Sequence, residues 1–200
     1  FEGGTPAKYA FYGEGRDRYY VVNDTLEKSN TFTWSYYTDA TNYKQEEICQ
    51  GTSYQAIGSG RANTAEIMAK DDGAYVSNAY SKTTIWYAFN EFNNGRYTIT
   101  GGNNGDCKDW FVPSLNELLK MIRLVDKLTW NDGDDKKTEE APYASDPAWA
   151  DLKTYVAAGS EWSSTGSAAA NAYLWYGTAT GKCYPNAKNF AGRLVAVRAF

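Results

Sequence analysis

Residues 161–200 read EWSSTGSAAANAYLWYGTATGKCYPNAKNFAGRLVAVRAF. The stretch opens with Trp-Ser-Ser, which predicts a turn, and it closes on a Val- and Ala-rich run that predicts a strand over 194–200. Residues 171–175 predict another strand, and the Gly-Thr-Ala-Thr-Gly run at 177–181 predicts a hairpin-type turn. Small, polar and aromatic residues fill the rest. We therefore expect scaffold strands here that support a display surface.

The clearest helix lies upstream of this stretch and begins at Ser114. Ser114 is expected at the N-cap, with Glu117 three residues later as its capping-box partner. Leucine, isoleucine and valine recur between residues 115 and 125 at helical spacing, so one face of this helix is apolar and should cover a sheet.

Two further helices are predicted from their caps. Asn63 is expected at an N-cap with Glu66 as its partner, in a helix that runs to about Lys70. Asp146 followed by Pro147 predicts the start of a short helix that ends near residue 158.

The N-terminal part of the chain favours strands. Residues 9–22, YAFYGEGRDRYYVV, predict two β segments around a Gly-Glu-Gly turn, and residues 31–37, TFTWSYY, predict a third strand. Strands early, helices in the middle and strands at the end indicate the α+β class. We expect a single domain over residues 1–200, with N-terminal strands over 9–56, helices and loops over 57–158, and the display segment over 159–200.

Composition excludes several kinds of function. The chain has 200 residues, a net charge of −4 and no histidine, which excludes Ser-His-Asp chemistry and histidine-ligated zinc. No lysine- and arginine-rich stripe appears, so no nucleic-acid partner is expected. The 17 tyrosines and 7 tryptophans suit either a binding surface or a β-rich core, and composition alone leaves both open.

The cysteines Cys49, Cys107 and Cys183 lie far apart without Cys-x-x-Cys spacing, so a zinc or redox site is not expected. One disulfide with a leftover thiol, or three thiols, both stay open. No apolar run approaches the roughly 20 residues needed to cross a bilayer, so direct membrane insertion is not expected. The sequence opens at Phe1 without a signal-peptide pattern, and a leader or anchor would not be visible in it.

Two motifs have ordinary interpretations. Gly58-x-Gly60 lacks the third glycine of a dinucleotide turn, because Asn63 stands there, so a glycine turn before a helix is expected. Residues 131–140, NDGDDKKTEE, lack the spacing and distal glutamate of a calcium-binding EF-hand loop. A charged surface loop is the expectation, and no cofactor is predicted; a structural calcium ion stays open without support.

Four blocks in order carry a resemblance: IGSGRANTAEI (57–67), DWFVPSLNEL (109–118), WSSTGS…NAYLWY (162–176) and VAVRAF (195–200). Together they resemble the C-type-lectin-like domain found at the C-terminus of a collagen-like bacterial adhesin. The same type of domain serves as the variable protein of diversity-generating retroelements in bacteria, phages and other viruses. The resemblance covers about residues 9–200, and the chain departs from the family pattern at Tyr173, Gly177, Val195 and Ala196.

The resemblance implies a C-type-lectin-like fold with mixed or antiparallel sheets and two or three helices, and it implies binding rather than catalysis. In the family, adenine-rich codons of the display segment are mutagenised. Gly181 and Lys188 match a family glycine and lysine, and Tyr173 and Trp175 are expected to face the core. The residues expected to form the ligand surface are Leu174, Tyr176, Tyr184, Asn186, Ala187, Asn189, Phe190 and Arg193.

The implied partner is a protein or glycan ligand on another cell or particle, and a homo-oligomer stays open. The implied location is extracellular, on a cell surface or on a virion. A fixed cell-surface adhesin or carbohydrate-binding module is the alternative to a diversified receptor. An enzyme of the formylglycine-generating type, which depends on cysteines, is the less favoured rival.

Overall fold

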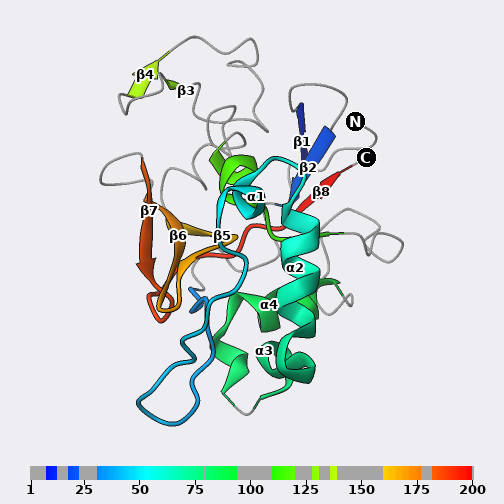
Figure 1. Cartoon of the computed structure of the whole chain (residues 1–200). Coiled ribbons are helices and arrows are strands. Elements are labelled where there is room, and N and C mark those ends of the chain that lie inside the picture. The colour runs from blue at the N-terminus through cyan, green and yellow to red at the C-terminus, as the bar shows by residue number, and fades with distance from the viewer. Residues whose placement is uncertain are drawn as a thin grey trace.

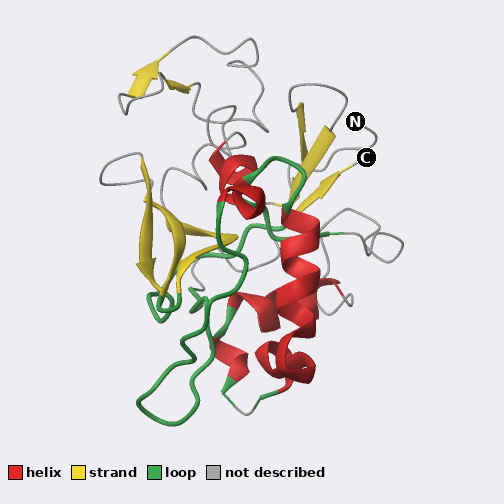
Figure 2. Cartoon of the chain, in the orientation of Figure 1, coloured by secondary structure: helices red, strands yellow, loops and turns green. Residues whose placement is uncertain are grey.

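The computed structural model of the chain shows an α+β protein, as the sequence predicts (Figure 1, Figure 2). The residues that the structure describes are 8–12, 18–22, 31–78, 80–93, 110–119, 128–130, 136–138, 160–176 and 182–199. The predicted helix at 146–158 and the predicted turn at 177–181 lie outside these residues.

One three-stranded sheet joins the two ends of the chain. It contains β1 (Lys8–Tyr12), β2 (Arg18–Val22) and β8 (Val197–Ala199), all antiparallel, in the order β1-β2-β8. The two strands predicted within 9–22 are therefore confirmed. The predicted final strand is shorter than expected, because residues 194–196 are buried without pairing as a strand.

A second antiparallel sheet contains β5 (Ser160–Ala168), β6 (Asn171–Tyr176) and β7 (Lys182–Ala187), with β6 in the middle. The strand predicted at 171–175 is confirmed. The turn predicted at Trp162–Ser164 is wrong, because these residues lie inside β5. Residues 161–166 of β5 are all buried, so both faces of the strand are covered. Small serine, threonine and glycine side chains fit between two packed layers, whereas in an isolated sequence they suggest a turn.

A two-stranded ladder pairs β3 (Leu128–Trp130) with β4 (Lys136–Thr138). The surface loop predicted over 131–140 therefore contains a short strand. The rest of that segment, for which a structural calcium ion stays open, lies outside the described residues.

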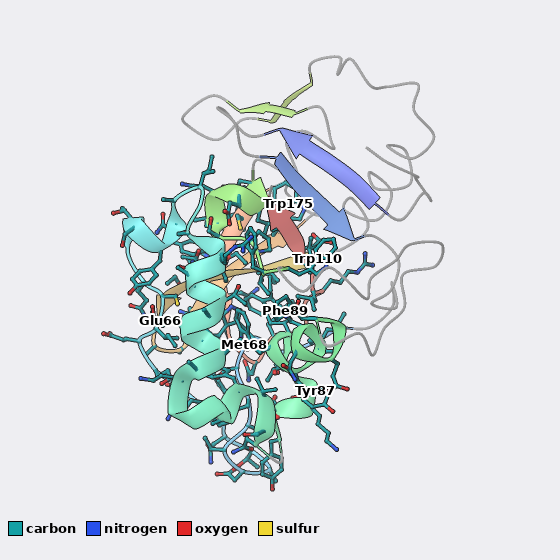
Figure 3. All side chains as sticks on the ribbon, turned by 90° about the vertical axis from the view of Figure 1, so that its right-hand side faces the viewer. Glu66, Met68, Tyr87, Phe89, Trp110 and Trp175 are labelled. Atoms are coloured by element: carbon teal, nitrogen blue, oxygen red, sulfur yellow. The ribbon has the colours of Figure 1, made fainter. Side chains whose placement is uncertain are left out.

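The helices gather on the side of the molecule away from β7 (Figure 2). Phe89 from α4 is buried, and Met68 from α2 packs against the same core, between the two helices (Figure 3). Residues 115–119 are helical as well. The helices are α1 (Thr52–Gln55), α2 (Gly60–Ala69), α3 (Ala74–Ser77) and α4 (Ile85–Asn93), with 3-10 turns η1 (Lys70–Gly73) and η2 (Ser81–Thr83).

The two predicted capping boxes have opposite outcomes. At Ser114 the prediction is confirmed: the backbone N–H of Ser114 donates to Oε2 of Glu117 at 2.7 Å, and the N–H of Glu117 donates to Oγ of Ser114 at 3.3 Å. At Asn63 it is wrong, since α2 begins three residues earlier and Asn63 is buried inside it. Its Nδ2 donates to the carbonyl of Tyr54 at 2.7 Å instead.

Aromatic rings form the centre of the core. Trp34 meets Trp86 and Tyr75 edge to face, with ring centroids 5.2 and 6.1 Å apart, and all three side chains are fully buried. Such edge-to-face pairs add to the stabilisation from apolar burial. The strand predicted over 31–37 is wrong as a regular element, because this segment makes isolated bridges only, for example between Phe32 and Gly192. Its tryptophan is held by tertiary contacts.

Among the described residues, no helix has the length and apolar character needed to cross a bilayer.

Candidate ligand-display surface

Strand β7 lies at an edge of the second sheet, since it pairs with β6 and with no other described strand. Pro185 sits in its middle, opposite Tyr173. Proline has no backbone N–H to donate, so within sheets it is found on edge strands. Tyr184 lies opposite Leu174, and 41% of its surface is exposed. The edge of this sheet therefore presents a large aromatic side chain to solvent.

A tight turn follows β7 and presents a second aromatic ring. The N–H of Phe190 donates to the carbonyl of Ala187 at 2.8 Å and closes the turn. Asn189 and Phe190 are both exposed, Phe190 to the same 41% as Tyr184. Large hydrophobic side chains with this exposure are uncommon among the described residues, where only Ile57 and Tyr80 join these two.

The other predicted surface residues of this segment differ in their distance from Tyr184. Asn186 and Ala187 are half-buried, and Oδ1 of Asn186 accepts a hydrogen bond from the N–H of Ala187 at 2.9 Å. Arg193 is half-buried too, but its backbone pairs with β5, on the opposite edge of the sheet from β7. Arg193 therefore lies three strand spacings from β7, roughly 14 Å. Arg193 is therefore not part of the group around Tyr184.

Leu174 was predicted to face the ligand, and this prediction is wrong. Its side chain is fully buried in the core, because the segment that contains Gly192 lies on its face of the sheet. A Cβ added at Gly192 would come within 2.6 Å of Cδ1 of Leu174. Trp175, on the other face of β6, is fully buried as predicted, whereas Tyr173 is only half-buried. The side chain of Tyr176 lies outside what the structure describes.

Lys188 fixes the backbone beside these exposed residues, although a lysine is among the side chains least often buried. Its side chain is fully buried, with Nζ 4.6 Å from the ring centroid of Trp34. Nζ also donates to the carbonyl of Glu46 at 2.7 Å. Burial lowers the pKa of Lys188 to about 8, against the opposing effect of the negative charges of Glu46 and Glu47. Gly181, its predicted companion, lies outside the described residues.

The backbone of Lys188 is tied down as firmly as its side chain. Its carbonyl accepts hydrogen bonds from the N–H groups of Trp34 and Ser35, at 2.7 and 3.0 Å. Its own N–H donates to the carbonyl of Ala170 at 2.9 Å. The turn after β7 is thus anchored to the 34–35 segment and to the β5–β6 turn.

The sequence blocks at 57–67, 109–118 and 162–176 meet through buried polar contacts. Glu117 accepts from the N–H of Gly58 at 2.8 Å, which joins the first two blocks. The N–H of Ser164 donates to the carbonyl of Pro113 at 2.7 Å, and Nδ2 of Asn63 lies 3.2 Å from Oγ of Ser164. These contacts form a scaffold under the sheet that carries β7.

Burial raises the pKa of Glu117, and hydrogen bonds from the N–H groups of Ser114 and Gly58 oppose that rise. There is no room for a side chain at Gly60, where an added Cβ would meet Oε2 of Glu117 and lie 2.7 Å from the N–H nitrogen of Ser114. Glycine at this position therefore allows α2 to approach the Ser114 capping box. Glu117 and Ser114 act as structural groups here.

Sequence reasoning missed the hairpin over residues 37–43. Tyr37 and Tyr43 pair across its base, and residues 38–42 are all exposed. Figure 1 shows this hairpin, in blue, projecting from the lower left of the molecule. Its Thr-Asp-Ala-Thr-Asn composition is a turn signal that the assignment of a strand over 31–37 left unused.

The described cysteines are poor candidates for thiolate chemistry. Cys49 and Cys183 are free thiols, and Cys107 lies outside the described residues. Burial raises the pKa of Cys49 to about 12, and it also raises the pKa of Cys183 above its usual range. Within the described residues, no three cysteine, aspartate or glutamate side chains gather in a way that could hold a metal ion.

Comparison with models of known protein families gave no match, and a search of curated proteins gave no significant match.

Proposed function

We propose that this chain is a ligand-binding protein that displays a variable surface on a C-type-lectin-like scaffold. The observation that carries the proposal is the exposure of Tyr184 and Phe190 on and beside an edge strand whose neighbour, β6, is buried on both faces. Rigid aromatic side chains give large contact areas at low entropic cost, and adjacent asparagines add adaptable hydrogen bonding. Asn186 and Asn189 supply such groups.

The contacts among the sequence blocks support the scaffold part of the proposal. Residues that are far apart in sequence but shared with the family pattern, such as Gly58, Glu117 and Ser164, bond to one another or to neighbouring blocks. A family signature whose members meet in the core explains why those residues occur together. Tyr184, Asn189 and Phe190 are exposed, and substitution is tolerated best at the surface.

The ligand in this proposal is a protein or glycan on another cell or particle, with the domain outside the cell, on a cell surface or on a virion. A fixed adhesin shares the fold with a diversified receptor and differs only in its ligand. A reverse transcriptase and a near-identical adenine-rich template repeat beside the gene would favour the diversified receptor. A gene neighbourhood with neither would favour the fixed adhesin.

The rival enzyme proposal needs a reactive cysteine. Burial disfavours the thiolates of Cys49 and Cys183, and the thiolate is the form that acts as a nucleophile. Binding therefore accounts better for the described residues.

A surface-display library tests the proposal directly. Tyr184, Asn186, Asn189 and Phe190 are randomised together in the full chain, and the library is selected for binding to lysozyme, a small protein with an open cleft. Most members are expected to fold and be displayed, and rounds of selection are expected to yield specific binders.

The matched control library randomises Trp162, Ala172, Leu174 and Lys188, which are all buried. Most of its members should fail to fold. The proposal fails if the first library loses folded protein to the same extent, or if it folds but yields no binder.

A further inference from the structure

The hairpin over residues 37–43 is stiff despite its exposure. The N–H of Thr38 donates to the carbonyl of Asn42 at 2.8 Å. Within the tip, Oδ1 of Asp39 accepts from the N–H groups of Thr41 and Asn42, at 2.8 and 2.9 Å. Hydrogen bonds from these two residues hold the pKa of Asp39 well below its usual range. The hydroxyl of Thr41 and Nδ2 of Asn42 also donate to the Asp39 carboxylate, and the hydroxyl of Thr38 donates to the carbonyl of Asn42. These polar groups therefore hold the hairpin together, and Ala40 adds an exposed methyl group at its tip.

Lys188 joins this hairpin to the turn that bears Phe190. Its carbonyl accepts from the N–H groups of Trp34 and Ser35, which precede the hairpin, and its Nζ donates to the carbonyl of Glu46, three residues after the hairpin ends. At the base of the hairpin, the N–H of Lys44 donates to the carbonyl of Tyr36 at 2.8 Å. One buried residue therefore fixes the position of the hairpin relative to Asn189 and Phe190.

We infer that the hairpin over residues 37–43 is a second, fixed arm of the binding surface, and that the partner is a folded protein with a concave surface. This inference rests on the proposed function. The first arm consists of Tyr184, Asn189 and Phe190. Both arms start from the backbone that Lys188 holds, which fixes them relative to each other, and we expect one partner to contact both.

Shape and chemistry favour a protein partner. The hairpin projects from the molecule (Figure 1), and projecting loops of binding proteins insert into concave epitopes. Its stiffness lowers the entropy lost when it is held by a partner. Tyrosine, threonine and asparagine make up five of the seven hairpin residues, and the first arm contributes a further tyrosine and asparagine. Tyrosine and asparagine are enriched in loops that bind proteins.

The test uses the lysozyme binders selected from the display library in the full chain. Ala40→Arg places a long charged side chain at the hairpin tip, where Ala40 is exposed and the hydrogen bonds of Asp39 are left in place. Ala65→Arg makes the same change at an exposed position of α2 and serves as the matched control. Thermal unfolding of each variant verifies that it is folded.

In most independent binders, Ala40→Arg is expected to weaken lysozyme binding about tenfold or more, while Ala65→Arg changes it by about twofold or less. Equal effects of the two variants, or no effect of either, would overturn the inference and leave the proposed function standing. A library without binders would remove both. If the unmodified chain binds to arrayed oligosaccharides, and Ala40→Arg leaves that binding unchanged, the protein partner is wrong.

Discussion

Strands β6 and β7 are hydrogen-bonded neighbours that differ in how far their side chains are buried. NAYLWY of β6 buries consecutive residues, Leu174 and Trp175, on its two faces. In KCYPNA of β7, Tyr184 is 41% exposed, although it lies directly opposite Leu174. The two side chains share a face of the sheet and differ in their place across it. Position within the sheet therefore decides which aromatic or aliphatic residues are available to a ligand.

The largest expected effect is on stability, when Leu174 and Tyr184 are each truncated to alanine in separate variants. Leu174→Ala should lower the free energy of unfolding by about 2–5 kcal/mol, because it leaves a cavity in a packed core. Tyr184→Ala should cost about 1 kcal/mol or less, in the range of surface substitutions. Chemical denaturation of both variants measures the difference. Equal costs would show that β7 is covered as fully as β6.

Gly192→Ala tests what covers β6. The new methyl group would lie 2.6 Å from Cδ1 of Leu174 and from Nε1 of Trp162, so the free energy of unfolding should fall by about 1–3 kcal/mol. Ala191→Ser, at the exposed neighbouring residue, is the control and should have little effect. A neutral Gly192→Ala would mean that the 190–193 segment does not pack on this face.

The pH dependence of the free energy of unfolding tests how the burial of Lys188 affects stability. Its pKa of about 8 in the folded protein lies below its ordinary value of 10.5, so the folded state binds fewer protons than the unfolded state between these limits. Lys188 therefore contributes stability that is present above pH 10.5 and is lost as the pH falls toward 8. The wild type should gain on the order of 2–3 kcal/mol over Lys188→Met between pH 8 and 10.5.

Taking the difference between these two proteins removes effects common to both, such as the ionisation of Cys49 in the unfolded chain. The groups that act on Lys188 are Glu46, Glu47 and Cys49. Urea unfolding at several pH values gives the two stability curves. Parallel curves would show that the ammonium of Lys188 is as well solvated in the folded protein as in the unfolded chain.

The smallest effect is local and concerns the hairpin. Asp39→Ala should change the amide resonances of Thr41 and Asn42 and speed the exchange of their protons, because both N–H groups lose their acceptor. The melting temperature should stay nearly constant, since this exposed loop is far from the core. In the wild type, nuclear magnetic resonance should show Asp39 titrating well below the ordinary aspartate value of about 4. An ordinary titration would mean a mobile tip.

Sequence patterns predict structure correctly here where the interacting residues are close together in the chain. The Ser114–Glu117 box involves residues three apart, and the 9–22 hairpin needs only strand propensity and a glycine turn. Asn63 carries the same kind of local signal and was assigned wrongly. Its side chain bonds to Tyr54 and lies close to Ser164, and no spacing rule reveals contacts over such sequence distances.

The candidate surface was predicted in part, for a related reason. Tyr184, Asn189 and Phe190 follow from the resemblance and are exposed, whereas Leu174 was chosen from strand alternation. Alternation assigns residues to faces, but it does not say whether a face is covered. Here Gly192, eighteen positions later in the chain, allows a segment to cover Leu174. The hairpin at 37–43 was missed because a strand had been assigned across its start.

The burial of Lys188 has a consequence for evolution. Its four hydrogen-bonding partners, Trp34, Ser35, Ala170 and Glu46, all take part through main-chain atoms. Mutations that alter the side chains of Ser35, Ala170 or Glu46 leave these bonds available, and changes at residues 189 and 190 do not touch them. One lysine thus holds this loop through bonds that do not depend on the side chains of Ser35, Ala170 and Glu46. The position of the loop is then inherited independently of the side chains at 189 and 190, which in the proposed function determine what the loop binds.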